Sequence, residues 1–158
     1  MRYGMVGISF RSSLLASFQS NKLVELTMPN SCIKQLWDGR NSFDKLKRIR
    51  LSHSKNLIET PDLSGVPNLE QLELQYCTSL CKVHPSIRFL KRLKCLYLQG
   101  CKRLKRLPDE MISLESLKRL YLTGCSRLNK IPDSVGNMTS LRHLHLEGTA
   151  IKKVTTII

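Results

Sequence analysis

The sequence predicts an α/β repeat fold, a solenoid with a curved parallel β-sheet on its concave face and irregular or short helical segments on its convex face. Two observations support this prediction. The pattern LxxLxLxxC, with small polar residues replacing the cysteine in some copies, starts at residues 23, 46, 69, 93, 117 and 141. The intervals are 23 or 24 residues, a period typical of leucine-rich repeats.

The first half of each unit predicts a short β-strand. In the unit that starts at Leu93, Leu96 and Leu98 alternate with Tyr97, so that the two leucines point to one face and the tyrosine to the other. One unit cannot bury its leucines alone, because a single strand has no second layer to pack against. We therefore expect neighbouring units to stack and form one continuous core.

The second half of each unit predicts a segment that returns along the convex side. Apolar positions recur there in the three most regular units, as in Leu80, Val83, Ile87 and Leu90. Four prolines mark the turn at which the return begins, where a missing N–H does no harm: Pro61, Pro85, Pro108 and Pro132.

The repeat pattern divides the chain into two parts. We expect a divergent N-terminal segment with a partial repeat at 1–22 and an array of about six units at 23–158. The sequence stops within a unit at 151–158, without the polar cap that a solenoid requires. We therefore expect exposed leucines at the ends and a marginally stable chain that tends to associate.

Composition restricts the class of protein. No apolar run is long enough for a transmembrane helix, so we expect no membrane partner. Lys and Arg number 26 against 12 Asp and Glu, a net charge of +14 that favours an acidic partner surface or nucleic acid. The 6 cysteines are too few for a disulfide scaffold, and reduced cysteines fit the cytoplasm, with the nucleus as the alternative.

Three cysteines recur at the ninth position of their units, and we interpret Cys77, Cys101 and Cys125 as a structural ladder that satisfies the turns. The alternative is a zinc site, which needs four ligands in a tetrahedral array. A column spaced at the strand separation of about 4.8 Å does not supply that geometry. We therefore expect no metal at these cysteines.

The sequence offers no set of catalytic residues. GxxxxGK[ST], GxGxxG and HExxH motifs are absent, and no serine or cysteine has an evident base and orienting partner. His143 and His145 alone make a weak metal site. We expect a protein without enzymatic activity and without a cofactor.

The concave face is the candidate partner-binding surface, because side chains between the inward leucines should form columns across it. We expect Tyr97 and Tyr121, adjacent in space, to act as anchors. Arg119 and His145 are then contacts at the rim, and the alternative is that all these residues only cover a solvated sheet. The candidate residues are Arg50, Glu73, Tyr97, Arg119, Tyr121, His143 and His145.

Basic residues gather after the cysteine in two units and should line one lateral edge of the solenoid. This basic edge comprises Lys102, Arg103, Lys105, Arg106, Arg127 and Lys130. Three interpretations remain open: docking of an acidic protein surface, contact with nucleic-acid phosphates, and a solvated face that keeps the array soluble. Nucleic acid is disfavoured, because the edge lacks a reading helix and stacking aromatics.

Several longer strings are more specific than the leucine spacing: "NKLVELTMPNSCIKQLWDG", "SHSKNLIETPDLSGVPNLE", "GCKRLKRLP" and "GCSRLNKIP". With these strings, about residues 14–151 resemble the leucine-rich repeat region of plant TIR-NB-LRR disease-resistance proteins, in the group similar to the tobacco mosaic virus resistance protein N. The resemblance implies a part of an intracellular immune receptor whose repeats bind a pathogen effector or a guarded host protein. It also implies autoinhibitory docking on the nucleotide-binding module of the parent receptor.

The TIR and nucleotide-binding domains of that family are not matched by this sequence, so we expect a truncated form without their activities. Two alternatives to an interaction module remain. One is a basic nucleic-acid-binding solenoid, and the other is a non-functional remnant of a receptor gene.

Overall fold

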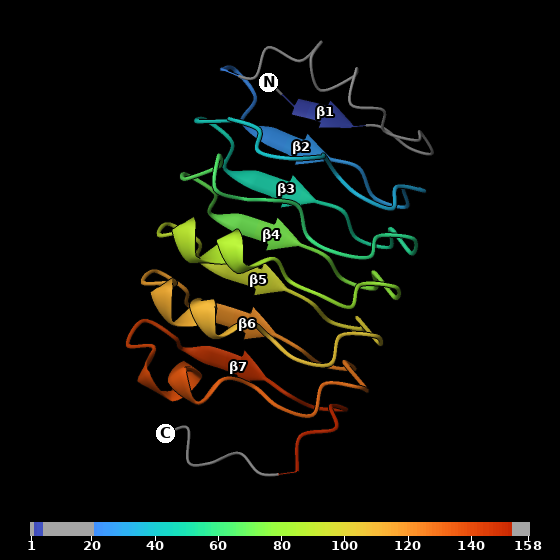
Figure 1. Ribbon diagram of the computed structural model, residues 1–158, viewed down its shortest axis with the longest axis vertical. Helices are drawn as coiled ribbons and strands as arrows, with labels where there is room; N and C mark the ends of the chain where they lie inside the picture. The colour runs from blue at the N-terminus through green and yellow to red at the C-terminus, as the bar shows by residue number, and fades with distance from the viewer. Residues whose placement is uncertain (1, 5–20, 153–158) are drawn as a thin grey trace.

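One β-strand recurs in every coil of the chain, and the coils stack along a single axis (Figure 1). The computed structural model describes residues 2–4 and 21–152. Within these residues the strands form one 7-stranded parallel sheet in sequence order. The strands are β1 (Arg2–Gly4), β2 (Glu25–Thr27), β3 (Arg48–Arg50), β4 (Gln71–Glu73), β5 (Cys95–Tyr97), β6 (Arg119–Tyr121) and β7 (His143–His145).

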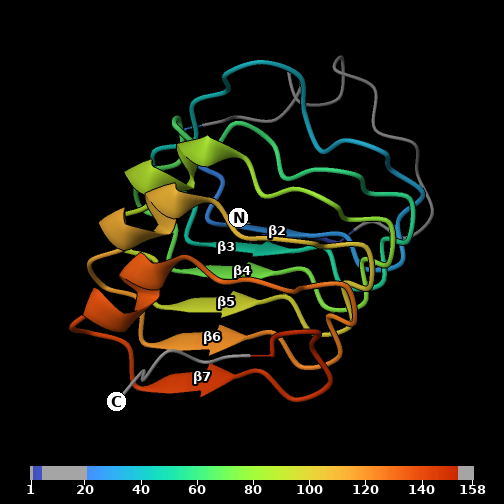
Figure 2. The same ribbon diagram turned by 60° about the horizontal axis from the view of Figure 1, so that its bottom comes forward.

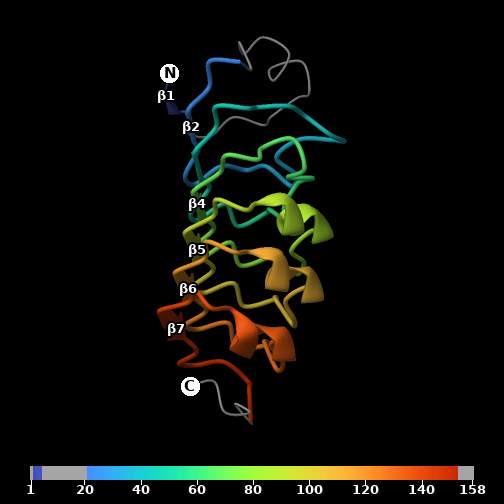
Figure 3. The same ribbon diagram turned by 90° about the vertical axis from the view of Figure 1, so that its left-hand side faces the viewer.

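The repeat period of the sequence sets the register of the sheet. Leu72 of β4 pairs with Leu96 of β5, and Leu96 pairs with Leu120 of β6, so each strand aligns with its neighbour one full unit away. Figure 3 shows the strands stacked along one side of the molecule, with the return segments on the other. The predicted leucine-rich repeat solenoid is therefore confirmed.

The sheet also includes β1, which precedes the first of the six units found in the sequence. Arg2 pairs with Glu25, the same 23-residue offset that relates the next strands. The rest of the N-terminal segment, residues 5–20, lies outside the described residues. Residues 153–158 also lie outside them, and these residues make up most of the segment 151–158 in which we expect no polar cap.

The helical part of the fold consists of 3₁₀-helices, and the described residues contain no α-helix. They are η1 (Pro85–Phe89), η2 (Asp109–Ser113) and η3 (Asp133–Asn137), each starting at or directly after a proline. Figure 2 shows the chain turning at the carboxyl end of each strand and returning across the convex side to these helices. The helices occur in the units that are 24 residues long, whereas the return segments of the 23-residue units are irregular.

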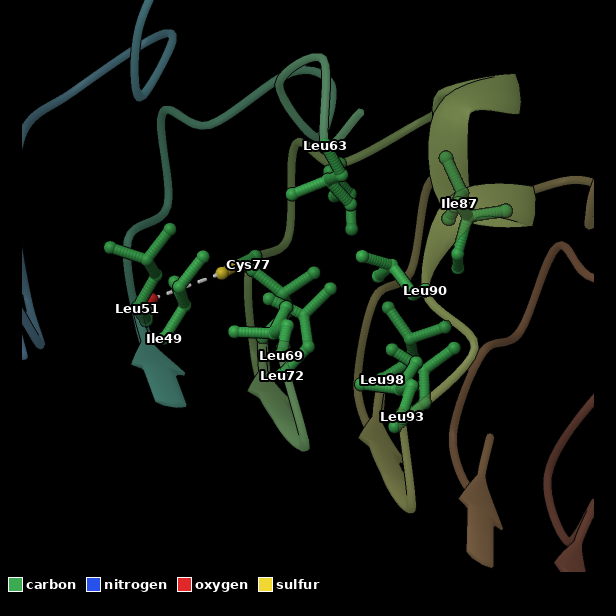
Figure 4. Packing of buried hydrophobic residues seen from close by; sticks show 14 of the residues in the cluster. Ile49, Leu51, Leu63, Leu69, Leu72, Cys77, Ile87, Leu90, Leu93 and Leu98 are labelled. Carbon is green, nitrogen blue, oxygen red and sulfur yellow. Dashed lines mark hydrogen bonds between the residues drawn. The ribbon is translucent and has the colours of Figure 1, made fainter. Parts of the chain in front are cut away.

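Leucines from successive coils fill the space between the sheet and the return segments. Leu72, Leu96 and Leu120 are at most 1% exposed. Figure 4 shows strand leucines packed against Ile87 and Leu90, which cover the core from the convex side. Each such side chain contributes about 1.5–3 kcal/mol through burial, so the stacking of coils dominates the stability of the fold.

A residue with positive φ follows each strand from β2 onward, at the eighth position of its unit. Glycine adopts this conformation without strain, whereas other residues do so at a cost. The ring of Tyr76 lies over Gly100, at the place where a Cβ on that glycine would be. The residues are Asn30 (57°), His53 (63°), Tyr76 (58°), Gly100 (70°), Gly124 (75°) and Gly148 (70°).

The two glycines at 100 and 124 should respond differently to substitution. We expect Gly124→Ala to lower the free energy of unfolding by about 1–2 kcal/mol, because alanine is strained at positive φ. Gly100→Ala should lower it further, since its methyl group also collides with the Tyr76 ring. Urea unfolding of both variants measures the difference.

The Tyr76→Gly background provides the control. Without the tyrosine ring, Gly100→Ala should cost as much as Gly124→Ala. Equal losses in the presence of Tyr76 would contradict the steric account.

Candidate functional site

The exposed side of the sheet, which we call the concave face, carries side chains in columns set by the strand register. One column contains Arg50, Glu73, Tyr97, Tyr121 and His145, and the next contains Arg119 and His143. The structure thus brings all seven candidate residues onto two adjacent columns. The two ends of this face differ in their chemistry.

Three aromatic rings form a continuous stack on β5, β6 and β7, and we call Tyr97, Tyr121 and His145 the aromatic column. The ring centroids of Tyr97 and Tyr121 are 5.0 Å apart with an interplanar angle of 5°. Those of Tyr121 and His145 are 4.8 Å apart at 18°. The strand spacing of about 4.8 Å matches a stacking distance, so the register itself produces the stack.

His145 is the end of this stack. Its ring continues the aromatic column beyond Tyr121, and its expected role as a contact at the rim of the binding surface stays a prediction. At the other end of the column, burial is the main cause that raises the pKa of Tyr97, followed by the neighbouring thiol of Cys95. The column is therefore a continuous stack of rings with polar edges.

Charged residues on β2, β3 and β4 pair with one another. Arg50 Nε donates to Glu73 Oε1 at 3.0 Å, and Arg50 Nη1 lies 3.6 Å from Glu25 Oε1. Arg48 Nη1 lies 3.6 Å from Glu25 Oε2. The hydrogen bond with Glu73 is the main cause that raises the pKa of Arg50. Arg50 and Glu73, both candidate partner residues, thus satisfy each other within the chain.

Glu25 joins this network with Arg48, and neither is among the candidate residues of the sequence analysis; Glu25 is the more buried of the two. It is 7% exposed although it lies on the outer side of the sheet, because Arg48 and Arg50 of the next strand contact it. A carboxylate one full repeat before an arginine is the sequence signal that could have identified it. Because of these ion pairs, the charged groups on this half of the concave face already have partners of opposite charge within the chain.

Arg119 lies beside the aromatic column without an acidic partner among the described residues. Its Nη1 contacts Cys95 Sγ at 3.8 Å, and this contact is the main cause that raises the pKa of Arg119. Farther along the face, Thr123 Oγ1 donates to Glu147 Oε2 at 3.1 Å. An exposed guanidinium next to stacked rings is thus available to a partner.

The three repeated cysteines form a ladder of buried thiols. Each thiol donates to a carbonyl oxygen of the preceding coil: Cys77 to Leu51 at 3.2 Å (Figure 4), Cys101 to Leu74 at 3.2 Å and Cys125 to Leu98 at 3.0 Å. Ser54 occupies the same position one coil earlier and its hydroxyl donates to Met28 O at 3.4 Å.

Burial raises the pKa of the three ladder thiols. The pKa of Cys77 reaches about 12 and that of Cys125 about 11, against 9.0 for a free thiol. Burial raises the pKa of Cys101 as well. The thiols therefore stay protonated at neutral pH and can act as hydrogen-bond donors. In the described part of the chain, no group of three His, Cys, Asp or Glu is placed to hold a metal ion.

The six residues of the basic edge are exposed on the two coils that follow β5 and β6. They come after the turn at which these strands end, at the right of Figure 1. Arg106 and Lys130 pair in a short parallel bridge. This edge is separate from the concave face, because the turn containing the cysteine ladder lies between them in each coil.

Comparison with known proteins identifies the repeat. Models of the family described as Leucine Rich Repeat match residues 22–40 and 116–138. The leucine-rich repeat domain of the type III effector XopL has a similar structure, with a TM-score of 0.69 and 22% identity, covering 96% of this chain and 62% of that one. An internalin C2 from Listeria monocytogenes matches with a TM-score of 0.51 and 20% identity over 85% of this chain and 66% of that one.

Relatives in sequence carry the name disease resistance protein. The chain is 48% identical over 80 residues to RPV1 of Vitis rotundifolia, covering 51% of this chain and 6% of that protein. It is 44% identical over 82 residues to RML1B of Arabidopsis thaliana, covering 52% of this chain and 8% of that protein. The resemblance to plant disease resistance proteins is confirmed, although the matched part is less than a tenth of their length.

No helix in the described ranges is long and apolar enough to cross a lipid bilayer. The leucine-rich repeat fold typically serves protein interaction, since its solenoid presents an extended concave surface. That use agrees with the columns described above.

The cysteine ladder predicts a loss of stability at alkaline pH. Unfolded thiols with a pKa near 9.0 release protons before folded thiols with a pKa of about 12 and about 11 do so. The contribution of these thiols is therefore complete below pH 9 and is lost as pH rises toward 11–12. We expect each thiol to account for a loss of about 1 kcal/mol by about pH 10, measured by urea unfolding.

Cys77→Ser is the matched variant, because Ser54 already occupies the equivalent position one coil earlier. Its unfolding free energy should fall less steeply above pH 9 than that of the unmodified chain. Identical pH profiles for the two proteins would show that Cys77 does not contribute in this way.

Proposed function

We propose that this leucine-rich repeat chain is the protein-interaction module of a plant intracellular immune receptor. The partner contacts the half of the concave face carried by β5, β6 and β7. The observation that carries the proposal is the aromatic column with Arg119 beside it. Tyrosine and arginine are enriched among the residues that dominate protein interfaces. The tyrosine ring buries much area with few rotatable bonds, and the guanidinium group of arginine supplies several hydrogen-bond donors in a planar arrangement.

The other half of the face supports this placement. Arg50, Glu73 and Glu25 form ion pairs within the chain, so a partner gains little from them and would have to replace existing contacts. Arg119 has no such pair among the described residues, and His143 is exposed on the next strand. The partner that fits carries an acidic group near a flat apolar surface.

The relatives suggest the biological setting of this interaction. Their names connect the sequence with disease resistance in plants. The proposed partner is a pathogen effector or a guarded host protein in the cytoplasm or nucleus. The nucleotide-binding module of a parent receptor is the intramolecular alternative, in which the contact holds the receptor inactive.

Two other functions predict different behaviour. A nucleic-acid-binding solenoid should lose affinity steeply as salt rises, because each phosphate contact releases counterions. A non-functional remnant should show no selective partner. The geometry favours the interaction module, since both faces of the Tyr121 ring are covered by Tyr97 and His145 and are closed to a nucleic-acid base.

Tyr121→Ala tests the proposal. In pull-downs from infected and uninfected leaf tissue, proteins that bind the concave face should be retained by the unmodified chain and lost with this variant. For a purified partner, calorimetry should show binding weakened about 30-fold, the loss of a dominant interface residue of about 2 kcal/mol.

Tyr76→Ala is the control, because this tyrosine is also stacked, on His53 with a centroid distance of 4.9 Å, and is even more exposed than Tyr121, but lies in the turn after β4. It should retain every partner. The proposal fails if the two variants retain the same proteins, or if added salt removes all binding to the unmodified chain.

A further inference from the structure

Charged residues occupy the same position in four successive coils. In one pair of neighbouring coils their charges are opposite, and in another pair they are alike. Glu59, Lys82, Arg106 and Lys130 are related by offsets of 23, 24 and 24 residues. Glu59 and Lys82 pair in a parallel bridge, and their side chains form an ion pair of 3.0 Å. Arg106 and Lys130 pair in the same kind of bridge with two positive charges.

The fold does not require this repulsion. Like charges directly opposite each other in a bridge destabilise it, and the bridge between Glu59 and Lys82 shows that the same position accepts a compensated pair. No carboxylate among the described residues forms an ion pair with Arg106 or Lys130. An interaction outside the chain would account for the uncompensated charge.

The rest of the basic edge is equally uncompensated in the described residues. Lys102, Arg103, Lys105 and Arg127 are exposed and take part in none of the ion pairs there. The opposite edge differs in part, because Lys91 pairs with Glu115 at 2.9 Å and Lys94 with Glu70 at 2.7 Å. A purely solubilising role does not explain why ion pairs form there whereas none of those in the described residues involves the basic edge.

A hollow of about 550 Å³ adjoins these charges on the convex side. Lys105, Arg106 and Lys130 line it, together with the exposed Cys81 and the partly exposed rings of Pro85 and Pro108. Among the described residues, no aromatic side chain lines it, and the carboxylates Asp109 and Glu110 are part of its wall. The hollow therefore offers positive charge and apolar contact in the same place.

We propose that the basic edge and this hollow bind an acidic protein segment, an extended stretch of Asp and Glu with apolar residues between them. The segment places its carboxylates against Arg106, Lys130 and Lys105, and its apolar side chains against the walls of the hollow. A nucleic acid fits less well, because it finds no ring to stack on among the described residues and has no aliphatic side chains to place against the apolar part of the wall. This surface is distinct from the concave face and does not depend on the function proposed above.

The test uses the full chain and a synthetic peptide of about ten residues in which Asp and Glu alternate with Leu, long enough to cross the three coils that line the hollow. A single-stranded oligonucleotide of equal charge is the competitor. Fluorescence anisotropy should show that the peptide binds more tightly than the oligonucleotide and that Arg106→Glu weakens its binding about fivefold or more.

Arg106→Glu keeps the test independent of folding, because it places a carboxylate opposite Lys130 as Glu59 lies opposite Lys82. The melting temperature of this variant should equal or exceed that of the unmodified chain. Lys118→Glu changes the net charge equally, but lies directly before β6, away from the hollow. It should leave peptide binding within about twofold, as expected for a distant exposed charge.

Three outcomes would overturn the proposal: no peptide binding at low salt, equal weakening by Lys118→Glu and Arg106→Glu, or tighter binding of the oligonucleotide that Arg106→Glu abolishes. The second outcome would mean attraction by net charge alone. The third would identify the edge as a nucleic-acid site.

Discussion

The structure depends on the burial of leucines between coils, because no coil has a second apolar layer of its own. Leu72, Leu96 and Leu120 are buried only since the coils before and after them are in register. Parallel pairing fixes that register at one full unit. Every other feature of the chain, from the thiol ladder to the aromatic column, is a set of residues that this alignment brings together.

How much could be predicted from the sequence follows from the same constraint. The spacing of leucines gives the strands and the core, and the ninth position gives the thiol ladder, because both depend only on the period. The ion pairs of Glu25 and the stacking of His145 depend also on side-chain conformation, which the period does not specify. The sequence predicts short helical segments without giving their type, since helices of 5 residues are too short for an apolar period to show.

The chain shows what one register can do with different residues at the same positions. Opposite charges in neighbouring coils cancel, as Arg50 and Glu73 do. Rings in neighbouring coils stack, as Tyr97 and Tyr121 do. Like charges accumulate, as Arg106 and Lys130 do. All three cases occur within one molecule. Equivalent positions in neighbouring coils can therefore be compared directly, and such a comparison shows which charges lack an opposite charge in the next coil.

The uniform register has an evolutionary consequence. Since the strands pair only with their neighbours and at the same relative positions, the duplication or loss of one whole coil would leave every remaining column aligned. Such an event would lengthen or shorten the surface by one side chain per column, about 4.8 Å. Duplication of a coil within the gene can therefore change the size of the recognition surface in discrete steps, and the pattern of buried leucines stays the same.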